Sequence, residues 1–327
     1  MVVTAKDVAR AAGVSQATVS YVINANPNQR ISEPTRRRVL DAAAALGYAP
    51  SAAARALRLG TSDAVLLVLP NIPFGHTVAH IIEQLTDDLE AIGLTLVTRR
   101  IREPGQALNA VRQLRPIAVI DVAALTEAEH DEIRRSGIPI SSSVLAPTSD
   151  VGALTVPQDT IGQLQVEHLA ARGHRVLGYA APQDDRVSEF LRLRLEGVRE
   201  ACLDLGLAQP VVVPVELSAD AGAAAVRAWQ DGSEPITAIC AYNDDVAFAL
   251  LAGMHRLGLS APDDFAVIGV DNVPLGALAS PPLTTIDQNV ELLAARIAAY
   301  VQFLLGNGPE PVSNGEDTLT LVVRESA

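Results

Sequence analysis

Short amphipathic patterns fill the first 48 positions of the chain. Each combines polar capping residues with an apolar stripe at helical spacing, and two of them end at a glycine. The first pattern consists of Thr4, Asp7, Val8, Ala9, Ala12 and Gly13. The second begins with Ser15 and Thr18, and its expected inner stripe consists of Val19, Val22 and Ile23. The third follows Ser32, has Pro34 in its first turn, and buries Val39, Leu40 and Ala43 before Gly47. They predict three helices, the first two joined as a helix-turn-helix; a small docking domain is the alternative.

From residue 61 onward, short apolar runs alternate with helical patterns. The runs cover 64–69, 94–97, 117–120, 138–140, 153–156, 175–179, 211–213, 236–240 and 265–270. Continuous apolar strands separated by helices are typical of parallel sheets covered on both faces. A break near Pro157 divides the pattern into two similar lobes. Because ligands of such sheets bind beyond the carboxyl ends of the strands, we expect a cleft between the lobes.

The charge of the chain is distributed unevenly between these two parts. The 327 residues carry a net charge of −13, which taken alone disfavours nucleic acid as a partner. Residues 1–60, however, hold eight basic and three acidic side chains, a net charge of +5, and the remainder carries −18. This asymmetry is expected where one end of a protein meets phosphates. It favours nucleic acid as the partner of the first 60 residues.

Composition and motifs argue against several classes of protein. No apolar run approaches the roughly 20 residues that span a bilayer, so no membrane partner is expected. The first residues lack the basic start and apolar core of a secretory signal, and we expect a cytoplasmic protein. Cys202 and Cys240 lie in apolar patterns without metal-ligand spacing, which predicts no disulfide and no metal site. Dinucleotide, phosphate-loop and nucleophile-elbow motifs are also lacking, so we expect neither an enzyme nor a cofactor.

The motif from Thr4 to Asn24 is a highly specific signal. Its letters, TAKDVARAAGVSQATVSYVIN, resemble the DNA-binding headpiece of the LacI/GalR family of bacterial transcriptional repressors. In that family the second helix enters the major groove and its first outward residues read base edges; here these are Gln16 and Ala17, with Tyr21 one turn further on. Glutamine can bond adenine, and an alanine methyl can contact thymine. The resemblance implies a double-stranded DNA operator as partner.

Other polar residues near this helix are candidates for the DNA backbone. Phosphate contacts fix the register of a protein on DNA without reading its sequence. The candidates are Thr4, Ser15, Thr18, Ser20 and Asn24. Arg36, followed by two further arginines at the start of the third helix, can also lie along the phosphates.

Residues 50–60 resemble the hinge helix of the same family. The segment is too short to persist as a helix in water, so we expect it to order when two copies pack together on DNA. A hinge leucine of the family inserts into the minor groove, and the matching residue here is Leu57. A plain linker is the alternative interpretation.

The rest of the chain resembles the periplasmic-binding-protein-like (type I) core of the family. The segments that carry the resemblance are 166–175, 191–197, 238–244, 267–271 and 281–286. The resemblance implies crossings between the lobes near Asp159, Asp287 and Asp317. The predicted fold is therefore a small all-α headpiece (1–48), a hinge (49–60) and a two-lobed α/β parallel-sheet core for effector binding and dimerisation (61–327). Lobe 1 would comprise about 61–158 and 288–317, and lobe 2 about 159–287 and 318–327.

The candidates for effector binding lie at strand ends and at a lobe crossing. They are Phe74, Arg194, Asn243, Asp271 and Gln288. Arg194 matches the arginine with which the family grips its ligand, and a guanidinium can hold two oxygens at once. Phe74, the sole aromatic residue of 61–158, can stack on a sugar or base or pack in the core. A structural cap or ion pair is the alternative for the polar candidates, and Asp244 fits a helix cap equally well.

Together these features predict a transcriptional repressor that binds a palindromic operator as a homodimer. Whether dimers associate into tetramers stays open. A small polar metabolite bound between the lobes would control DNA affinity. Carbohydrates are the family's commonest effectors, which favours a sugar inducer; a corepressor such as a nucleobase is the alternative. An enzyme on a doubly wound α/β fold is the remote alternative, and a transport protein would not carry the basic head.

Overall fold

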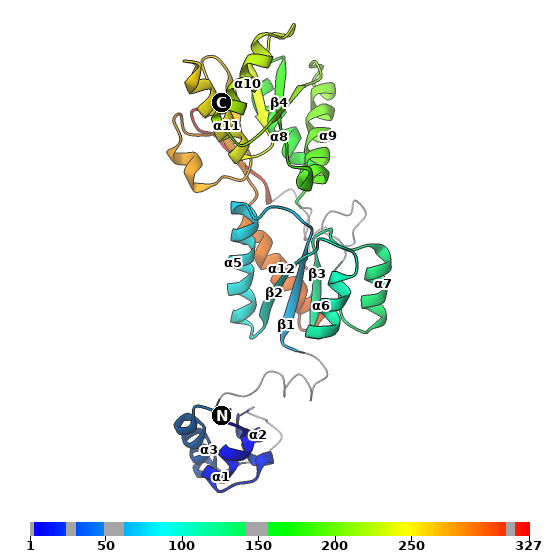
Figure 1. Cartoon of the computed structure of the whole chain (residues 1–327), viewed down its shortest axis with the longest axis vertical. Coiled ribbons are helices and arrows are strands. Elements are labelled where there is room, and N and C mark those ends of the chain that lie inside the picture. Colours follow the sequence, from blue (N-terminus) through cyan, green and yellow to red (C-terminus); the bar gives the residue numbers. More distant parts are fainter. Residues whose placement is uncertain (1–2, 24–30, 49–61, 142–155, 312–317) are drawn as a thin grey trace. The chain divides into compact units, whose positions relative to one another are not determined.

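The computed structural model describes residues 3–23, 31–48, 62–141, 156–311 and 318–327. The chain divides between Asp63 and Ala64 into two compact units, which are described separately. Figure 1 shows the first as a group of helices and the second as parallel sheets flanked by helices.

The first unit contains helices α1 (Ala5–Ala12), α2 (Gln16–Ile23) and α3 (Glu33–Leu46). Gly13, with a φ of 65°, ends α1 in the left-handed conformation that glycine adopts readily. The apolar stripes form the interior: Val8, Ala9, Ala12, Val19, Val22, Val39 and Ala43. The expectation that Leu40 is buried is wrong, because its side chain is 48% exposed. The buried stripe of α3 passes through Val39 and Ala43, and Leu40 lies about 100° around the helix from Val39.

Lobe 1 of the second unit is built on a parallel sheet of order β2-β1-β3. Its strands are β1 (Ala64–Leu69), β2 (Thr95–Arg100) and β3 (Ala118–Asp121), and every residue of β1 is buried. Helices α5 (His76–Ala91) and α12 (Val290–Leu304) cover one face; α6 (Gln106–Leu114) and α7 (Glu127–Arg135) cover the other. The strand predicted at 138–140 is reduced to one bridge between Val119 and Ile140, and 153–155 lie outside the described residues.

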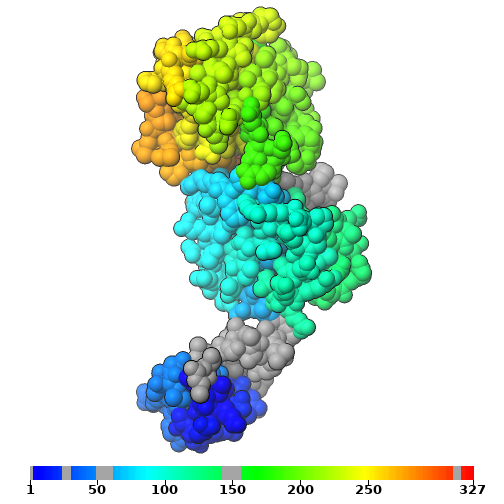
Figure 2. Space-filling model, viewed as in Figure 1, coloured from blue at the N-terminus to red at the C-terminus, as the bar shows by residue number. Residues whose placement is uncertain are grey.

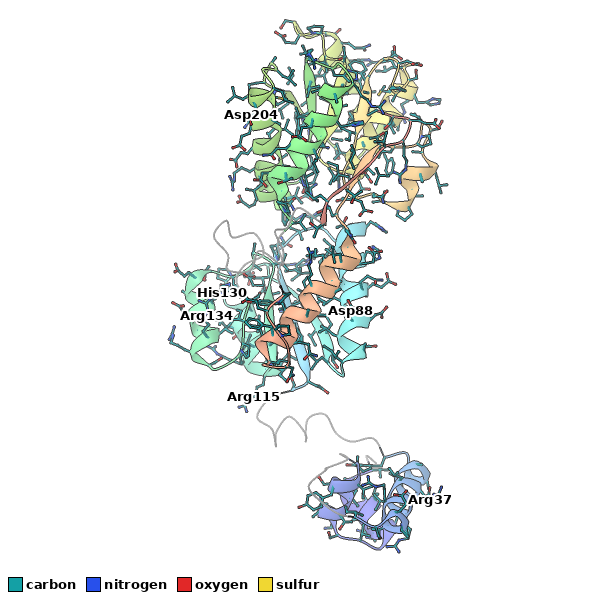
Figure 3. The ribbon with its side chains drawn as sticks, turned by 180° about the vertical axis from the view of Figure 1, so that it is seen from behind. Arg37, Asp88, Arg115, His130, Arg134 and Asp204 are labelled. Carbon is teal, nitrogen blue, oxygen red and sulfur yellow. The ribbon has the colours of Figure 1, made fainter. Side chains whose placement is uncertain are left out.

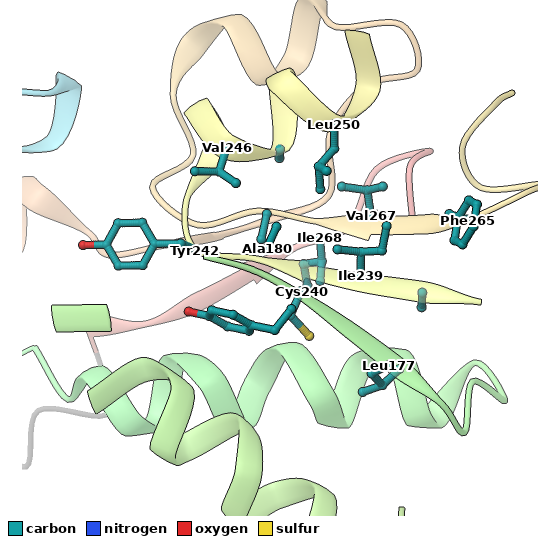
Figure 4. Packing of buried hydrophobic residues seen from close by; sticks show 14 of the residues in the cluster. Leu177, Ala180, Ile239, Cys240, Tyr242, Val246, Leu250, Phe265, Val267 and Ile268 are labelled. Carbon is teal, nitrogen blue, oxygen red and sulfur yellow. The ribbon is translucent and has the colours of Figure 1, made fainter. Parts of the chain in front are cut away.

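Lobe 2 contains a second parallel sheet, of order β5-β4-β6-β7. Its strands are β4 (Leu177–Pro182), β5 (Val211–Val215), β6 (Ala238–Ala241) and β7 (Ala266–Ile268). The flanking helices are α8 (Gln158–Ala171) and α9 (Ser188–Asp204) on one face, and α10 (Ala219–Gln230) and α11 (Asp244–Arg256) on the other. Figure 4 shows Val246 and Leu250 of α11 packing on this sheet, with Leu177 directed to the opposite face.

The chain passes between the lobes more than once. Helix α12 follows lobe 2 in the sequence but packs beside α5 in lobe 1. Strand β8 (Thr285–Asp287) pairs antiparallel with β9 (Thr320–Val322), after which Ser326 bonds to Val267 of β7. Figure 2 shows the two lobes in contact. The two predicted parallel sheets are thus present, while the limits of headpiece, hinge and lobes stay predictions.

Among the helices of the described residues, none combines the length and apolar character required to cross a membrane.

Candidate functional site

Helix α2 presents a polar face opposite its buried stripe. Val19 and Val22 point into the unit, whereas Gln16 and Ala17 at the start of the helix are exposed and Tyr21 is half-buried. The two residues predicted to read bases are therefore accessible on the described surface. Because both side chains lie exposed at the start of the helix, a DNA groove can reach them without rearrangement of the core.

The predicted phosphate contacts near α1 and α2 also cap these helices. The hydroxyl and the N–H of Thr4 both donate to the Asp7 carboxylate, at 2.6 and 3.0 Å. These bonds favour the charged carboxylate and lower the pKa of Asp7. The N–H of Thr18 donates to the Ser15 hydroxyl at 3.1 Å. Capping orients the hydroxyls at the helix starts, where a phosphate can meet them together with free N–H groups.

The positive charge of the headpiece is displayed on its surface. Lys6, Arg10, Arg37 and Arg38 are exposed, and Figure 3 shows Arg37 on the outside of the unit. Arg36 is half-buried, and its Nε lies 3.8 Å from a carboxylate oxygen of Glu33. Such an exposed pair is weak, so the guanidinium stays available to a phosphate. Ser20 is half-buried on α2; Asn24 and Leu57 lie outside the described residues.

A cavity of about 800 Å³ lies between the two lobes of the second unit. Lobe 2 contributes the carboxyl ends of its strands, with Pro182 at the end of β4, Tyr242 just after β6 and Asp271 after β7. Lobe 1 contributes Leu69 at the end of β1 and Val122 after β3. The position agrees with the expectation that ligands of such sheets bind beyond the carboxyl ends of the strands.

Arg194 is held inside this cavity by two hydrogen bonds. Its Nε donates to Oε1 of Gln158 at 2.8 Å, and one terminal nitrogen donates to the carbonyl of Tyr242 at 2.7 Å. The guanidinium also lies 4.7 Å from the centre of the Tyr242 ring, and the side chain is only 5% exposed. Because Gln158 and the carbonyl of Tyr242 hold the guanidinium in place, this buried cation is preorganised to receive polar ligand atoms.

The close packing of α8 and α9 brings Gln158 and Arg194 together. A Cβ atom at Gly197 would lie 1.9 Å from the carbonyl oxygen of Asp159, and one at Gly162 would lie 2.2 Å from that of Arg194. Only glycine permits this approach of the two helices. The separation of the helices therefore positions the Arg194 side chain.

Asp271 and Gln288 face the same cavity and are bonded to each other. Nε2 of Gln288 donates to Oδ1 of Asp271 at 2.5 Å. Asp271 has a φ of 111°, a conformation costly for an L-residue, and its N–H donates to the carbonyl of Ile286 at 2.8 Å. Burial raises the pKa of Asp271, and the nearby Arg194 guanidinium opposes this rise. The strained turn thus holds a carboxylate beside a buried cation.

Asn243 and Asp244 have different roles at the start of α11. Oδ1 of Asn243 caps the helix by accepting from the N–H of Val246 at 3.0 Å, and the residue lines the cavity. Asp244 does not line the cavity. Its carboxylate is fully buried and accepts from the Thr285 hydroxyl at 2.6 Å and from the N–H of Val273 at 2.9 Å. Asp244 therefore braces the turn that carries Asp271, a role that adjacency in the sequence did not predict.

Phe74 is the one effector candidate that the structure does not place at the cavity. Its side chain is 49% exposed, and the guanidinium of Arg100 lies 5.3 Å from the ring centre. The neighbouring residues Ile72 and Pro73 line the cavity instead. Packing in the core, one of the two predicted roles, does not describe this exposed ring, and stacking on a ligand stays a prediction.

Sequence reasoning missed several polar residues of the cavity. Gln158 fixes Arg194 from another helix, and Asp184 at the rim forms a two-pronged pair with the side chain of Arg186, at 2.8 and 2.5 Å. The pairing lowers the pKa of Asp184. The available signal was the position of 184–186 directly after an apolar strand, as for the residues that were predicted.

A helix-turn-helix unit joined to a two-lobed α/β unit is the architecture of a bacterial DNA-binding regulatory protein. Residues 4–51 match the family described as bacterial regulatory proteins, lacI family, and residues 166–327 match the periplasmic binding protein-like domain. The HTH-type transcriptional repressor PurR of Photobacterium profundum is 30% identical over 298 residues, covering 87% of this chain and 86% of that protein. The chain belongs to the LacI family.

Other known proteins agree with this assignment. The HTH-type transcriptional repressor CytR of Escherichia coli (strain K12) is 28% identical over 293 residues, covering 87% of this chain and 84% of its own. A Lac repressor dimer bound to operator and the anti-inducer ONPF superposes with a TM-score of 0.83 at 24% identity, covering 100% of this chain and 99% of that one. The predicted fold class is confirmed. The similar proteins are transcriptional regulators, as predicted, and not enzymes.

Proposed function

We propose that this chain is a repressor that pairs into a homodimer, binds a palindromic operator with its headpieces, and releases or holds DNA according to a small molecule bound between its lobes. The observation that carries the control by a ligand is the polar group formed by the buried Arg194 and Gln288 with the half-buried Asp271 at the cavity between two lobes. A fixed cation beside a carboxylate and an amide suits a ligand rich in hydroxyl groups. A sugar inducer is therefore favoured, and the structure of the regulator CelR with cellobiose shows a similar fold (TM-score 0.66, 26% identity, 99% of this chain and 100% of that one).

The control of DNA affinity would follow from contacts with both lobes. A ligand that touches Arg194 in lobe 2 and the end of β1 in lobe 1 binds best at one relative rotation of the lobes. It can shift the operator affinity only as far as it prefers that rotation over the other. An inducer prefers the rotation that separates the two hinges, and a corepressor such as a nucleobase would prefer the rotation that joins them.

An exposed apolar patch supports pairing of two copies. Leu275 and Leu278 on the 3-10 helix Pro274–Leu278 are 66% and 79% exposed. Large apolar side chains grouped on a surface mark interaction sites. A two-fold pair would present two headpieces, and symmetry would then demand an operator with two half-sites related by the same two-fold axis.

The test starts from operator fragments selected from random duplex DNA with the purified full-length chain. We expect palindromic sites, bound in a fluorescence anisotropy titration with one dimer for each fragment. Sugars and nucleobases are then screened by thermal shift, because a ligand of the folded state raises the melting temperature. Selection of no preferred sequence, with or without every compound tried, would refute the proposal.

Arg194→Ala tests the ligand site within this assay. Each lost charge-assisted hydrogen bond is worth about 1.5–3 kcal/mol, so we expect the screened ligand to bind at least tenfold more weakly. The matched control is Arg192→Ala on the same helix, since Arg192 points outward and pairs with Glu189 and Glu196. An unchanged response of Arg194→Ala would place the ligand elsewhere.

A further inference from the structure

Two histidines lie four residues apart on α5. His76 is the first residue of the helix and is exposed, and His80 follows one turn later with 28% of its side chain exposed. Residues at this spacing lie on the same face of a helix. The two ring centres are 5.7 Å apart, and the rings are inclined at 41° to each other. The two imidazoles are therefore neighbours on the surface of lobe 1.

The geometry of this pair suits the chelation of one metal ion. Two histidines at positions i and i+4 of a helix bind zinc in the metalloprotease helix. With metal–nitrogen bonds of about 2.0–2.1 Å, the centres of two imidazoles on one tetrahedral ion lie roughly 5 Å apart. Small rotations of the two side chains bring the observed 5.7 Å to that separation, and the helix backbone does not have to move.

A carboxylate on the neighbouring helix supports the pair. Glu291 lies in the first turn of α12, which packs beside α5, and its Oε1 is 3.6 Å from Nε2 of His80. A histidine that binds a metal usually donates its other ring N–H to a carboxylate or carbonyl, which orients the ring and strengthens the bond to the metal. Glu291 is placed to orient His80 in this way.

Other metal-ligating side chains of the chain are engaged or buried. His130 bonds to the Asp121 carboxylate at 2.9 Å, His174 bonds to the Thr237 hydroxyl at 2.9 Å, and both cysteine thiols are buried. Among the described residues, no three histidine, cysteine or carboxylate side chains are gathered for a metal ion. The pair on α5 is therefore a chelate of two imidazoles, with water in the remaining positions around the ion.

We propose that His76 and His80 bind one divalent transition-metal ion of the class that prefers imidazole, which includes Ni²⁺, Cu²⁺ and Zn²⁺. Mg²⁺ and Ca²⁺ prefer oxygen ligands and would not bind there. Because His76 also lines the cavity between the lobes, the ion would lie at the edge of that cavity. The proposal does not depend on the proposed function, since it follows from the helix pair alone.

The test measures Ni²⁺ binding to the untagged full-length chain by calorimetry, with excess Mg²⁺ present to occupy surface carboxylates. We expect one ion per chain with a micromolar Kd, and Zn²⁺ should compete for the same site. Ni²⁺ should also raise the melting temperature, because the ion binds the pair only at its folded spacing. Binding that excess Mg²⁺ abolishes would overturn the proposal.

Substitution of the histidines locates the ion. His76→Gln and His80→Gln should each weaken Ni²⁺ binding at least tenfold, because each leaves a single imidazole. The matched control is His255→Gln, which removes an exposed histidine near the end of α11 and should bind Ni²⁺ like wild type. Asparagine replaces glutamine at either position if circular dichroism shows that the first variant is unfolded.

The pattern of losses decides the outcome. Equal losses in His76→Gln and His80→Gln, with none in His255→Gln, are expected for a chelate. Unchanged affinity in either folded variant of the pair would overturn the proposal, since the ion would then not be held by both rings. A failure of operator selection would overturn the proposed function and leave these measurements unaffected.

Discussion

The buried carboxyl group of Asp244 should make the stability of lobe 2 depend on pH. Burial raises its pKa from the ordinary value of 3.8 to about 7, although the bonds from Thr285 and Val273 favour the charged form. Between these two values the folded chain holds a proton that the unfolded chain has lost. The contribution of protonated Asp244 to the stability of the fold is therefore complete below pH 3.8 and is lost as the pH rises through about 7.

The size of the effect follows from the two pKa values. One pKa unit corresponds to about 1.4 kcal/mol, so full ionisation of Asp244 costs the folded state about 4 kcal/mol. Because the chain has an isoelectric point of about 4.9, measurements begin above it. Between about pH 5.5 and 8.5, the free energy of unfolding should fall by about 2 kcal/mol of this total because of Asp244. We predict that the free energy of unfolding of the wild type falls by this amount relative to that of Asp244→Asn, which has no titrating group at position 244.

Trp229 provides the assay, because it is the sole tryptophan and lies in the same lobe. Its side chain is 2% exposed, and its Nε1–H donates to the carbonyl of Val211 at 2.9 Å. Urea unfolding followed by its fluorescence reports the free energy of unfolding at each pH. Asp231→Asn, which removes an exposed carboxylate after α10, is the control and should follow wild type. Wild-type and Asp244→Asn free energies that stay parallel from about pH 5.5 to 8.5 would refute the reasoning.

Further predictions concern helix packing and DNA. Gly197→Ala should lower the unfolding free energy by about 1–3 kcal/mol through overpacking and weaken ligand response, because its Cβ meets the Asp159 carbonyl; unchanged urea midpoints would contradict the close packing. Leu57→Ala should weaken operator binding in anisotropy titrations and leave ligand binding intact, whereas equal operator affinity would remove the hinge assignment. Operator affinity should fall steeply between about 50 and 200 mM salt as phosphate contacts release counterions, and a flat dependence would argue against the basic headpiece.

The sequence predicted the elements well because their signals are local. The capping pair Thr4 and Asp7, the apolar stripe of α1 and Gly13 lie within ten residues, and the structure contains the helix they predict. The same holds for β1, whose continuous apolar run marks a strand buried on both faces. Leu40 shows the limit: its apolar character alone did not tell which of two adjacent residues points inward.

The site depended on contacts between distant elements, which local patterns do not encode. Arg194 and Asp271 could be chosen as candidates from family resemblance and strand ends. The partner that fixes Arg194, Gln158, lies on another helix and became visible only through the glycine contacts between α8 and α9. Phe74 was chosen because it is the sole aromatic residue of its segment, but rarity carries no information about direction, and its half-exposed ring lies beside Arg100 and does not line the cavity.

The late position of α12 in the sequence has a consequence for biosynthesis. Strand β1 ends at Leu69, but α12, which covers one face of its sheet together with α5, begins at Val290. At roughly 5–20 residues per second, a ribosome needs on the order of 10–40 seconds to make the intervening chain. During that interval the nascent lobe 1 exposes the part of this aliphatic sheet face that α5 does not cover. Chaperone binding to ribosome-bound chains should therefore begin once β3 has emerged and end only when α12 leaves the exit tunnel.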